Sequence, residues 1–169
     1  MSDTSVLEPP KVSTELFDKA LQAEIDRIRS LPPDHRIVQA NANLLRGANG
    51  PLWGGVGTLE MVGAGWFATD CALALTDAST GVKTVVFSAT GFDWAAGAFH
   101  SLVTGAFVVD PATVAGRCGY SVAAVAAAEG VVSLSLYGPN GTCYGVFAGV
   151  IEVGAVVAGV HGVGDLLCL

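Results

Sequence analysis

The chain has 169 residues, of which 51% are hydrophobic and 14% are charged, and its formal net charge is −7 at pH 7. A chain this apolar is not disordered, and its length suffices for one ordinary domain and an appendage. The acidic balance argues against binding of nucleic acid or anionic lipid by charge, because both need clustered lysine and arginine.

Charged residues are concentrated near the start of the chain. The first 50 residues carry thirteen of them, whereas the following 119 residues carry ten. This division predicts a polar leader followed by a weakly charged β domain that is rich in glycine. A domain with so few charges offers few groups for acid–base, metal or phosphate chemistry.

One amphipathic helix is predicted over residues 13–31, after a proline-containing stretch, residues 1–12, that we expect to be flexible. A pair of prolines ends the helix, and its apolar stripe must pack on the domain that follows or on a partner. The stripe consists of Leu16, Phe17, Ala20, Leu21, Ile25 and Ile28. Residues 32–51 are predicted to be a connector, because asparagine, glycine and proline recur there.

Residues 52–169 are predicted to form the β domain, because short apolar blocks alternate there with glycine-containing turns. In residues 130–137, apolar and hydroxyl side chains alternate, as expected of a half-buried strand. The segment Tyr120–Ala128 is ambiguous, since its alanines also favour helix, and we interpret it as a strand. Eight strands are predicted, over residues 55–62, 65–76, 82–90, 98–109, 117–127, 130–137, 142–150 and 153–163, with a break at Glu152.

The predicted fold class is mainly β, a compact eight-stranded antiparallel β-barrel preceded by one amphipathic N-terminal helix. Closure removes the exposed edges that such an apolar sheet would otherwise present. Small side chains predict a narrow, packed interior, although they are also compatible with a cavity. The apolar run from Gly141 to Gly164 could span a bilayer by its length, but its seven glycines would weaken a helix, so we interpret it as strands.

Residues able to do chemistry are few and scattered. The four cysteines form no CxxC pair, so we expect buried thiols, with one or two disulfides as the alternative, and no zinc site. They are Cys71, Cys118, Cys143 and Cys168. The three histidines show no catalytic or metal-binding spacing, and no GxSxG motif is present. We therefore assign no catalytic residue, no metal ligand and no cofactor.

Certain aromatic and mid-strand polar residues could form a ligand site. The aromatic side chains could offer a surface to a sugar or a hydrophobic ligand, although core anchoring is their simpler role. Glu60 and Asp70 stand in mid-strand, whereas most other carboxylates fall at predicted turns. Solvent exposure explains them simply, and a pocket around them would make them an acid or base. The candidate ligand-binding residues are Trp66, Trp94, Phe99, His100, Glu60 and Asp70.

The C-terminal strands resemble those of the virulence-associated proteins (Vap) of rhodococci. The strand VVSLSLYGPNG turns into TCYGVFAGVIEVGAVVAGVHGVGDL, which is similar to the final hairpin of that family. The resemblance is carried by Tyr144, Gly145, Phe147, Ala148, Gly149, Gly154, Val156, Val157 and Gly159. It implies an eight-stranded barrel after a variable N-terminal segment, and a non-enzymatic secreted effector that acts on host endolysosomal compartments. It implies no catalytic residues.

The leading hypothesis is therefore a non-enzymatic, virulence-associated-like β-barrel effector that acts through a protein or membrane partner. The alternatives are a small barrel that binds an apolar small ligand, and a small-barrel isomerase or cyclase. Flat apolar strands and the helix stripe also suit a homo-oligomer. The N-terminus MSDTSVLEPPKVS lacks a signal sequence, so we expect a cytoplasmic protein, or one secreted with its leader removed or by a non-classical route.

Overall fold

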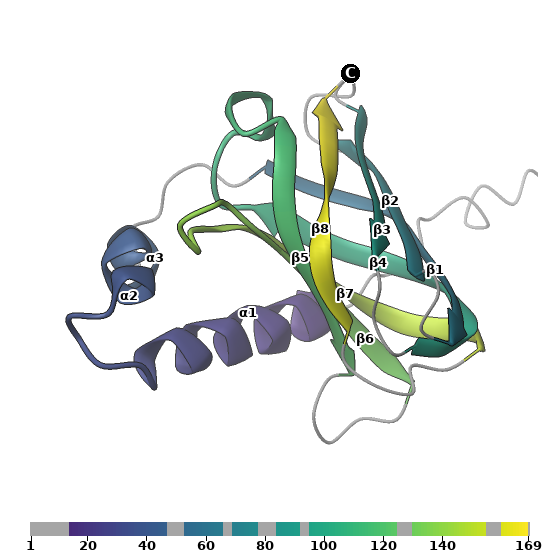
Figure 1. Cartoon of the computed structure of the whole chain (residues 1–169), viewed down its shortest axis with the longest axis horizontal. Coiled ribbons are helices and arrows are strands. Elements are labelled where there is room, and N and C mark those ends of the chain that lie inside the picture. Colours follow the sequence, from purple (N-terminus) through teal and green to yellow (C-terminus); the bar gives the residue numbers. More distant parts are fainter. Residues whose placement is uncertain are drawn as a thin grey trace, which may run out of the picture.

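The computed structural model describes residues 14–46, 53–65, 69–77, 84–91, 95–124, 130–154 and 160–168. In this part of the chain a helical arm precedes a curled antiparallel β-sheet (Figure 1). The helical arm consists of α1 (Thr14–Arg29), α2 (Arg36–Ala40) and α3 (Ala42–Leu45). The stretch expected to be flexible, residues 1–12, lies outside the described residues.

The described part of the sheet contains eight strands, and every pairing between neighbours is antiparallel. They are β1 (Trp53–Gly65), β2 (Thr69–Asp77), β3 (Thr84–Gly91), β4 (Ala95–Phe107), β5 (Gly116–Ala124), β6 (Val131–Tyr137), β7 (Cys143–Gly154) and β8 (Val160–Cys168). Hydrogen bonding follows the order β1-β2-β3-β8-β5-β6-β7-β4, and β1 also pairs with β4, so the pairings run round a closed ring.

The predicted mainly β, antiparallel architecture behind an N-terminal helix is confirmed. The predicted break at Glu152 is wrong. In the pairing of β4 with β7, His100 lies opposite Val153 and Ser101 lies opposite Ile151, so Glu152 is the extra residue of a β-bulge. A bulge bends a strand without ending it. The last strand accordingly covers Val160–Cys168 and not residues 153–163.

The predicted connector contains two short helices that hold the arm to the sheet. The backbone N–H of Ile37 donates to Nδ1 of His35 over 3.2 Å, which caps α2. Asn41 then bonds twice to the sheet: Nδ2 donates to the Gly141 carbonyl at 2.9 Å, and Oδ1 accepts from the Cys143 amide at 2.7 Å. Helices this short gain their stability from such tertiary contacts, so their own sequence predicts them poorly.

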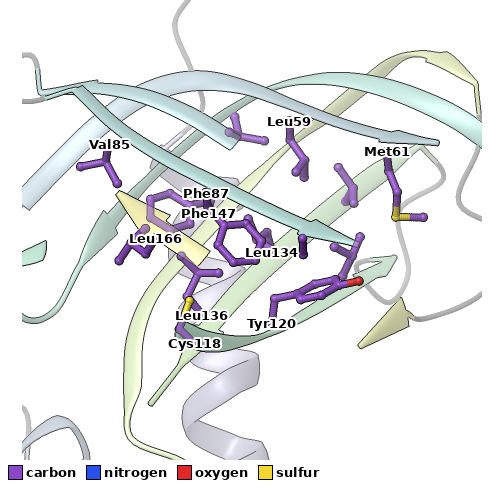
Figure 2. Packing of buried hydrophobic residues seen from close by; sticks show 14 of the residues in the cluster. Leu59, Met61, Val85, Phe87, Cys118, Tyr120, Leu134, Leu136, Phe147 and Leu166 are labelled. Atoms are coloured by element: carbon purple, nitrogen blue, oxygen red, sulfur yellow. The ribbon is translucent and has the colours of Figure 1, made fainter. Parts of the chain in front are cut away.

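Inward-facing side chains occupy the inside of the curled sheet (Figure 2). On β6, Leu134 and Leu136 are fully buried. The rings of Phe107 and Phe147 meet edge to face, with centroids 5.2 Å apart. The buried cluster consists of Leu59, Met61, Val85, Phe87, Ala89, Phe99, Val103, Phe107, Cys118, Tyr120, Val122, Val132, Leu134, Leu136, Phe147 and Leu166. The buried side chains that the structure describes in this interior are mostly apolar.

Two glycines allow the strands to approach closely around these rings. A Cβ on Gly105 would meet the carbonyl oxygen of Val146 and the ring of Phe147. A Cβ on Gly149 would meet the carbonyl oxygen of Leu102. A backbone oxygen cannot move aside as a flexible side chain can, so only glycine is compatible with this packing.

The helical arm packs on the outer face of the sheet, where α1 contacts β7 and β4. Ala20 of α1 belongs to a small buried cluster with Cys143, Val146 and Ala148 of β7. Leu16, Phe17, Leu21 and Leu44 pack around this cluster. Of the two predicted arrangements for the apolar stripe, packing on the chain's own domain is the one observed.

None of the described helices is both long enough and apolar enough to cross a membrane.

Candidate functional site

A hollow of about 510 Å³ lies between α1 and the outer faces of β5 and β6, and we call it the arm groove. Its lining residues are Ala20, Ala23, Glu24, Arg27, Ile37, Ser121, Ala123, Ser133, Ser135, Tyr137 and Gly141. The groove exists because both walls present small side chains. The large residues of β5 and β6 point into the interior of the sheet, so serine and alanine occupy most of the outward positions. On the opposite wall, α1 contributes two alanines.

A hydrogen-bonded ion pair closes one part of the groove. The carboxylate of Glu24 is buried, and its Oε1 accepts a hydrogen bond of 2.6 Å from Nη2 of Arg27. Its Oε2 accepts from Nε of Arg27 at 3.4 Å and from the hydroxyl of Tyr137 at 2.9 Å. The guanidinium carbon of Arg27 also lies 5.6 Å from the centroid of the Tyr137 ring, within the range of a cation–π contact. Glu24 is therefore a buried charge with partners on both oxygens.

The ionisation of this network favours binding over proton transfer. The hydrogen bond to Glu24 is the main cause that raises the pKa of Arg27 above its ordinary value. Burial raises the pKa of Tyr137, and the negative charge of Glu24 raises it further, so the phenol stays protonated at neutral pH. With the guanidinium and the phenol both in their protonated forms near pH 7, Arg27 and Tyr137 act as hydrogen-bond donors.

The burial of the two charged partners is very unequal. The Glu24 side chain is 7% exposed, whereas that of Arg27 is 48% exposed. Glu24 thus holds one edge of the guanidinium against the protein, while the rest of the guanidinium is accessible from outside. An arginine held in this way is arranged to receive a hydrogen-bond acceptor from outside.

The sequence-predicted candidates whose side chains the structure describes, Glu60, Phe99 and His100, do not line the arm groove. Glu60 and His100 are direct partners across β1 and β4, and Oε1 of Glu60 lies 3.7 Å from Nε2 of His100. On the other side of the imidazole, Oε2 of Glu152 lies 3.4 Å from Nδ1. Phe99 is 4% exposed and packs in the interior cluster, since adjacent strand residues face opposite sides of the sheet.

The other three candidates are Asp70, Trp66 and Trp94. Asp70 lies on β2, opposite Val62 of β1 in register. Trp66 and Trp94 lie outside the described residues. Among the residues that the structure describes, no group of three or more histidine, cysteine, aspartate or glutamate side chains has the arrangement of a metal site. Among the candidates whose side chains the structure describes, Glu60 and His100 are brought together.

One feature of the sequence indicates the arm groove, namely a carboxylate on the apolar face of the predicted helix. Glu24 lies four positions after Ala20 and four before Ile28, on the apolar stripe of the predicted helix. A carboxylate on the buried face of a helix needs a buried partner, so it marks a polar contact. The sequence does not predict that this partner is Tyr137, because Tyr137 is 113 positions away along the chain.

Two of the described cysteines, Cys118 and Cys143, are poor nucleophiles because they are buried. Cys118, Cys143 and Cys168 are free thiols, and the first two are buried, as predicted. Burial raises the pKa of Cys118 to about 11, with a further contribution from Asp165. Burial also raises the pKa of Cys143 to about 12, helped by Glu24. Thiols with such pKa values carry almost no thiolate at neutral pH, so they pack as small apolar groups.

Comparison with known proteins gives a likeness at the level of structure. No family model and no curated protein matches this sequence. The structure is similar to the virulence-associated protein VapB from the intracellular pathogen Rhodococcus equi, with a TM-score of 0.50 and 14% sequence identity. The likeness is one of fold. It covers 69% of this chain and 98% of VapB, so the resemblance predicted from the C-terminal strands is supported for the fold, while family membership stays a prediction.

Proposed function

We propose that this protein is a non-enzymatic, virulence-associated-like protein that acts by binding a protein partner in the arm groove. The fold likeness to VapB supports the general class. The nature of the surfaces supports binding, because the cluster described inside the sheet is largely apolar, whereas the hydrogen-bonded polar residues of the arm groove lie on the outer face. The side chains of Glu60 and His100 are 64% and 36% exposed, so this pair is in contact with solvent.

The observation that carries the proposal is the arm groove with its fixed Arg27. Its volume of about 510 Å³ is in the range of pockets that hold ligands or the anchoring side chains of a partner. Arginine and tyrosine are the residue types most enriched among energetically important interface residues, and here Arg27 and Tyr137 stand together at the groove wall. A protein partner is favoured over a membrane because the groove holds one neutral ion pair, while the chain as a whole is acidic.

The test is photocrosslinking from inside and outside the groove. A photoreactive phenylalanine analogue replaces Ala23 or Ser133 on its walls, or the exposed Ser88 of β3 as the control. We expect both groove positions to crosslink the same protein and Ser88 not to do so. The purified partner is then titrated calorimetrically with wild type and with Ser133→Trp, which fills the groove and should weaken binding at least tenfold. Equal crosslinking from Ser88, or unchanged affinity of Ser133→Trp, would contradict the proposal.

A further inference from the structure

We infer that the arm groove recognises a carboxylate, supplied by an acidic side chain on an apolar peptide segment of the partner. This inference rests on the proposed binding function and adds the chemistry of the group that is bound. The donors and acceptors that the ion pair already uses decide which chemical group it can still bind.

The acceptors of the network are used and some of its donors are not. Both oxygens of Glu24 accept hydrogen bonds within the protein, so the carboxylate offers little to an incoming group. The guanidinium of Arg27 has five N–H donors, and its bonds to Glu24 use Nε and Nη2. Among the described residues no acceptor is found for Nη1, and the side chain is 48% exposed. An incoming group therefore meets donors.

A carboxylate is the acceptor that fits these donors best. Its two coplanar oxygens match the planar fork of a guanidinium, and both partners keep their charge. Of the described residues that line the groove, Arg27 is the only cation, so a bound anion would lie beside it. The positive charge of the Arg27 guanidinium would repel an ammonium group from the same place. Glu24 would not compensate, because it lies buried behind the guanidinium and already has its hydrogen-bond partners.

The remaining walls fit a short apolar segment. Ala20, Ala23 and Ala123 supply methyl groups, and serine hydroxyls of β5 and β6 lie among them. A segment that places aliphatic carbons against the alanines, with its carboxylate at Arg27, would bury apolar area and leave no polar group unpaired. A glutamate or aspartate side chain flanked by small apolar residues has this composition.

The first experiment uses hexanoate as the probe, because it reduces the proposed group to a carboxylate on an aliphatic chain. Hexanoate, hexanamide and hexylammonium are titrated into the full chain labelled with nitrogen-15, and amide shifts are followed at Ala23, Ser133 and Ser135. We expect hexanoate to bind about tenfold more tightly than hexanamide, and hexylammonium not to shift these signals. Equal affinity of hexanoate and hexanamide would overturn the carboxylate inference while leaving a binding groove in place. If no probe shifts the groove signals, the inference fails whether or not crosslinking from Ala23 finds a partner.

Two variants test whether Arg27 causes the preference for hexanoate over hexanamide. Arg27→Gln should make hexanoate and hexanamide bind equally. Arg29→Gln is the matched control, because it removes an exposed arginine of the same helix whose hydrogen bond goes to the Leu45 carbonyl. It should leave the tenfold preference intact. If Arg27→Gln unfolds because Glu24 is left charged, the neutral double variant with Glu24→Gln takes its place, and a preference for hexanoate that survives in it contradicts the inference.

Two further measurements distinguish a peptide carboxylate from a lipid carboxylate and from general anion binding. A lipid site would gain about fourfold in affinity for each added methylene, so dodecanoate would bind far more tightly than hexanoate. We expect that gain to stop once the groove is filled, and its continuation over all six methylenes would overturn the peptide assignment. A second hollow, of about 230 Å³, is lined by Ser88, Arg117 and Asp165 among others. Equal hexanoate shifts there would indicate general binding of anions to arginine and would also contradict the inference.

Discussion

The hydroxyl of Tyr137, at the end of β6, donates a hydrogen bond of 2.9 Å to Oε2 of Glu24 on α1. This bond joins the helical arm to the sheet across 113 positions of sequence. It also completes the environment of a buried carboxylate, whose other donor is Arg27. The same contact therefore fixes where the arm docks and how Arg27 is presented in the arm groove.

Replacing Tyr137 by phenylalanine should loosen the docking of the arm. The change removes one donor from buried Glu24 and keeps the ring that Arg27 faces. Hydrogen bonds to charged groups contribute about 1.5–3 kcal/mol, so we expect a loss of about that size in the free energy of unfolding, measured in urea. Ser121→Ala is the control, since it alters the same groove away from Glu24 and should change stability by less than about 0.5 kcal/mol. Equal stability of Tyr137→Phe and wild type would contradict this role for the hydroxyl.

Replacing Asn41 by alanine should release the arm from the β6–β7 turn. The side chain makes two hydrogen bonds to the sheet, to the Gly141 carbonyl and the Cys143 amide, and it is 3% exposed. Their loss leaves a buried amide without its partner, and we expect about 2 kcal/mol of destabilisation. Hydrogen exchange at the Cys143 amide is the direct measurement, and it should accelerate at least tenfold.

Asn43 provides the matched control for this variant. It lies two positions later, is exposed, and accepts a hydrogen bond only from the nearby Arg46 among the described residues. Asn43→Ala should leave the exchange of the Cys143 amide unchanged. Similar acceleration in both variants would show that the arm is held by general helix stability and not by the two bonds of Asn41.

Much of the sheet could be predicted from local patterns, because the alternation in β6 and the glycine-rich turns depend on neighbouring residues alone. Its irregularities could not. Glu152 suggested a strand end, whereas the strand accommodates it in a bulge that only pairing with β4 defines. The short helices α2 and α3 depend in a similar way on Asn41 reaching the sheet.

The candidate site was harder to predict than the fold, for a physical reason. A site search by residue type selects histidines, mid-strand carboxylates and aromatics, and two of the residues that it selects, Glu60 and His100, are neighbours in the structure. The arm groove is formed instead by small side chains, alanine and serine, on its two facing walls. Its charged pair is marked in the sequence only by a carboxylate on the apolar face of a helix, and the partner Tyr137 lies 113 positions away.

Gly105 should not tolerate alanine, in contrast to Gly54 on the neighbouring strand. A methyl group on Gly105 would run into the Val146 carbonyl oxygen and the Phe147 ring, whereas one on Gly54 would find its nearest atom, a backbone oxygen, at 3.7 Å. Forcing a methyl into a well-packed region costs about 1–3 kcal/mol, and contact with backbone places Gly105→Ala at the upper end. Gly54→Ala should lie within about 0.5 kcal/mol of wild type. Thermal and urea unfolding of the two variants provide the comparison, and equal effects would contradict the packing described around Phe147.

The stability of the fold should decline at alkaline pH because of its buried thiols. Burial raises the pKa of Cys118 from 9.0 to about 11. Between these values the unfolded chain loses a proton that the folded chain keeps, so the free energy of unfolding falls as pH rises, by up to about 1.4 kcal/mol per pH unit for this thiol. Below pH 9 the thiol is protonated in both states and contributes no dependence. Cys143, with its pKa raised to about 12, should extend the decline in the same direction.

Urea titrations from pH 8 to pH 11 can isolate the contribution of Cys118. Cys118→Ala should begin from a lower stability, because it removes a buried side chain, and should then lose less stability between pH 9 and pH 11 than wild type does. Val122→Ala is the matched control, since it also deletes buried volume from β5 but no titrating group. Its curve should run parallel to that of wild type. If the curve of Cys118→Ala is parallel as well, this thiol titrates at its ordinary pKa and the alkaline decline has another origin.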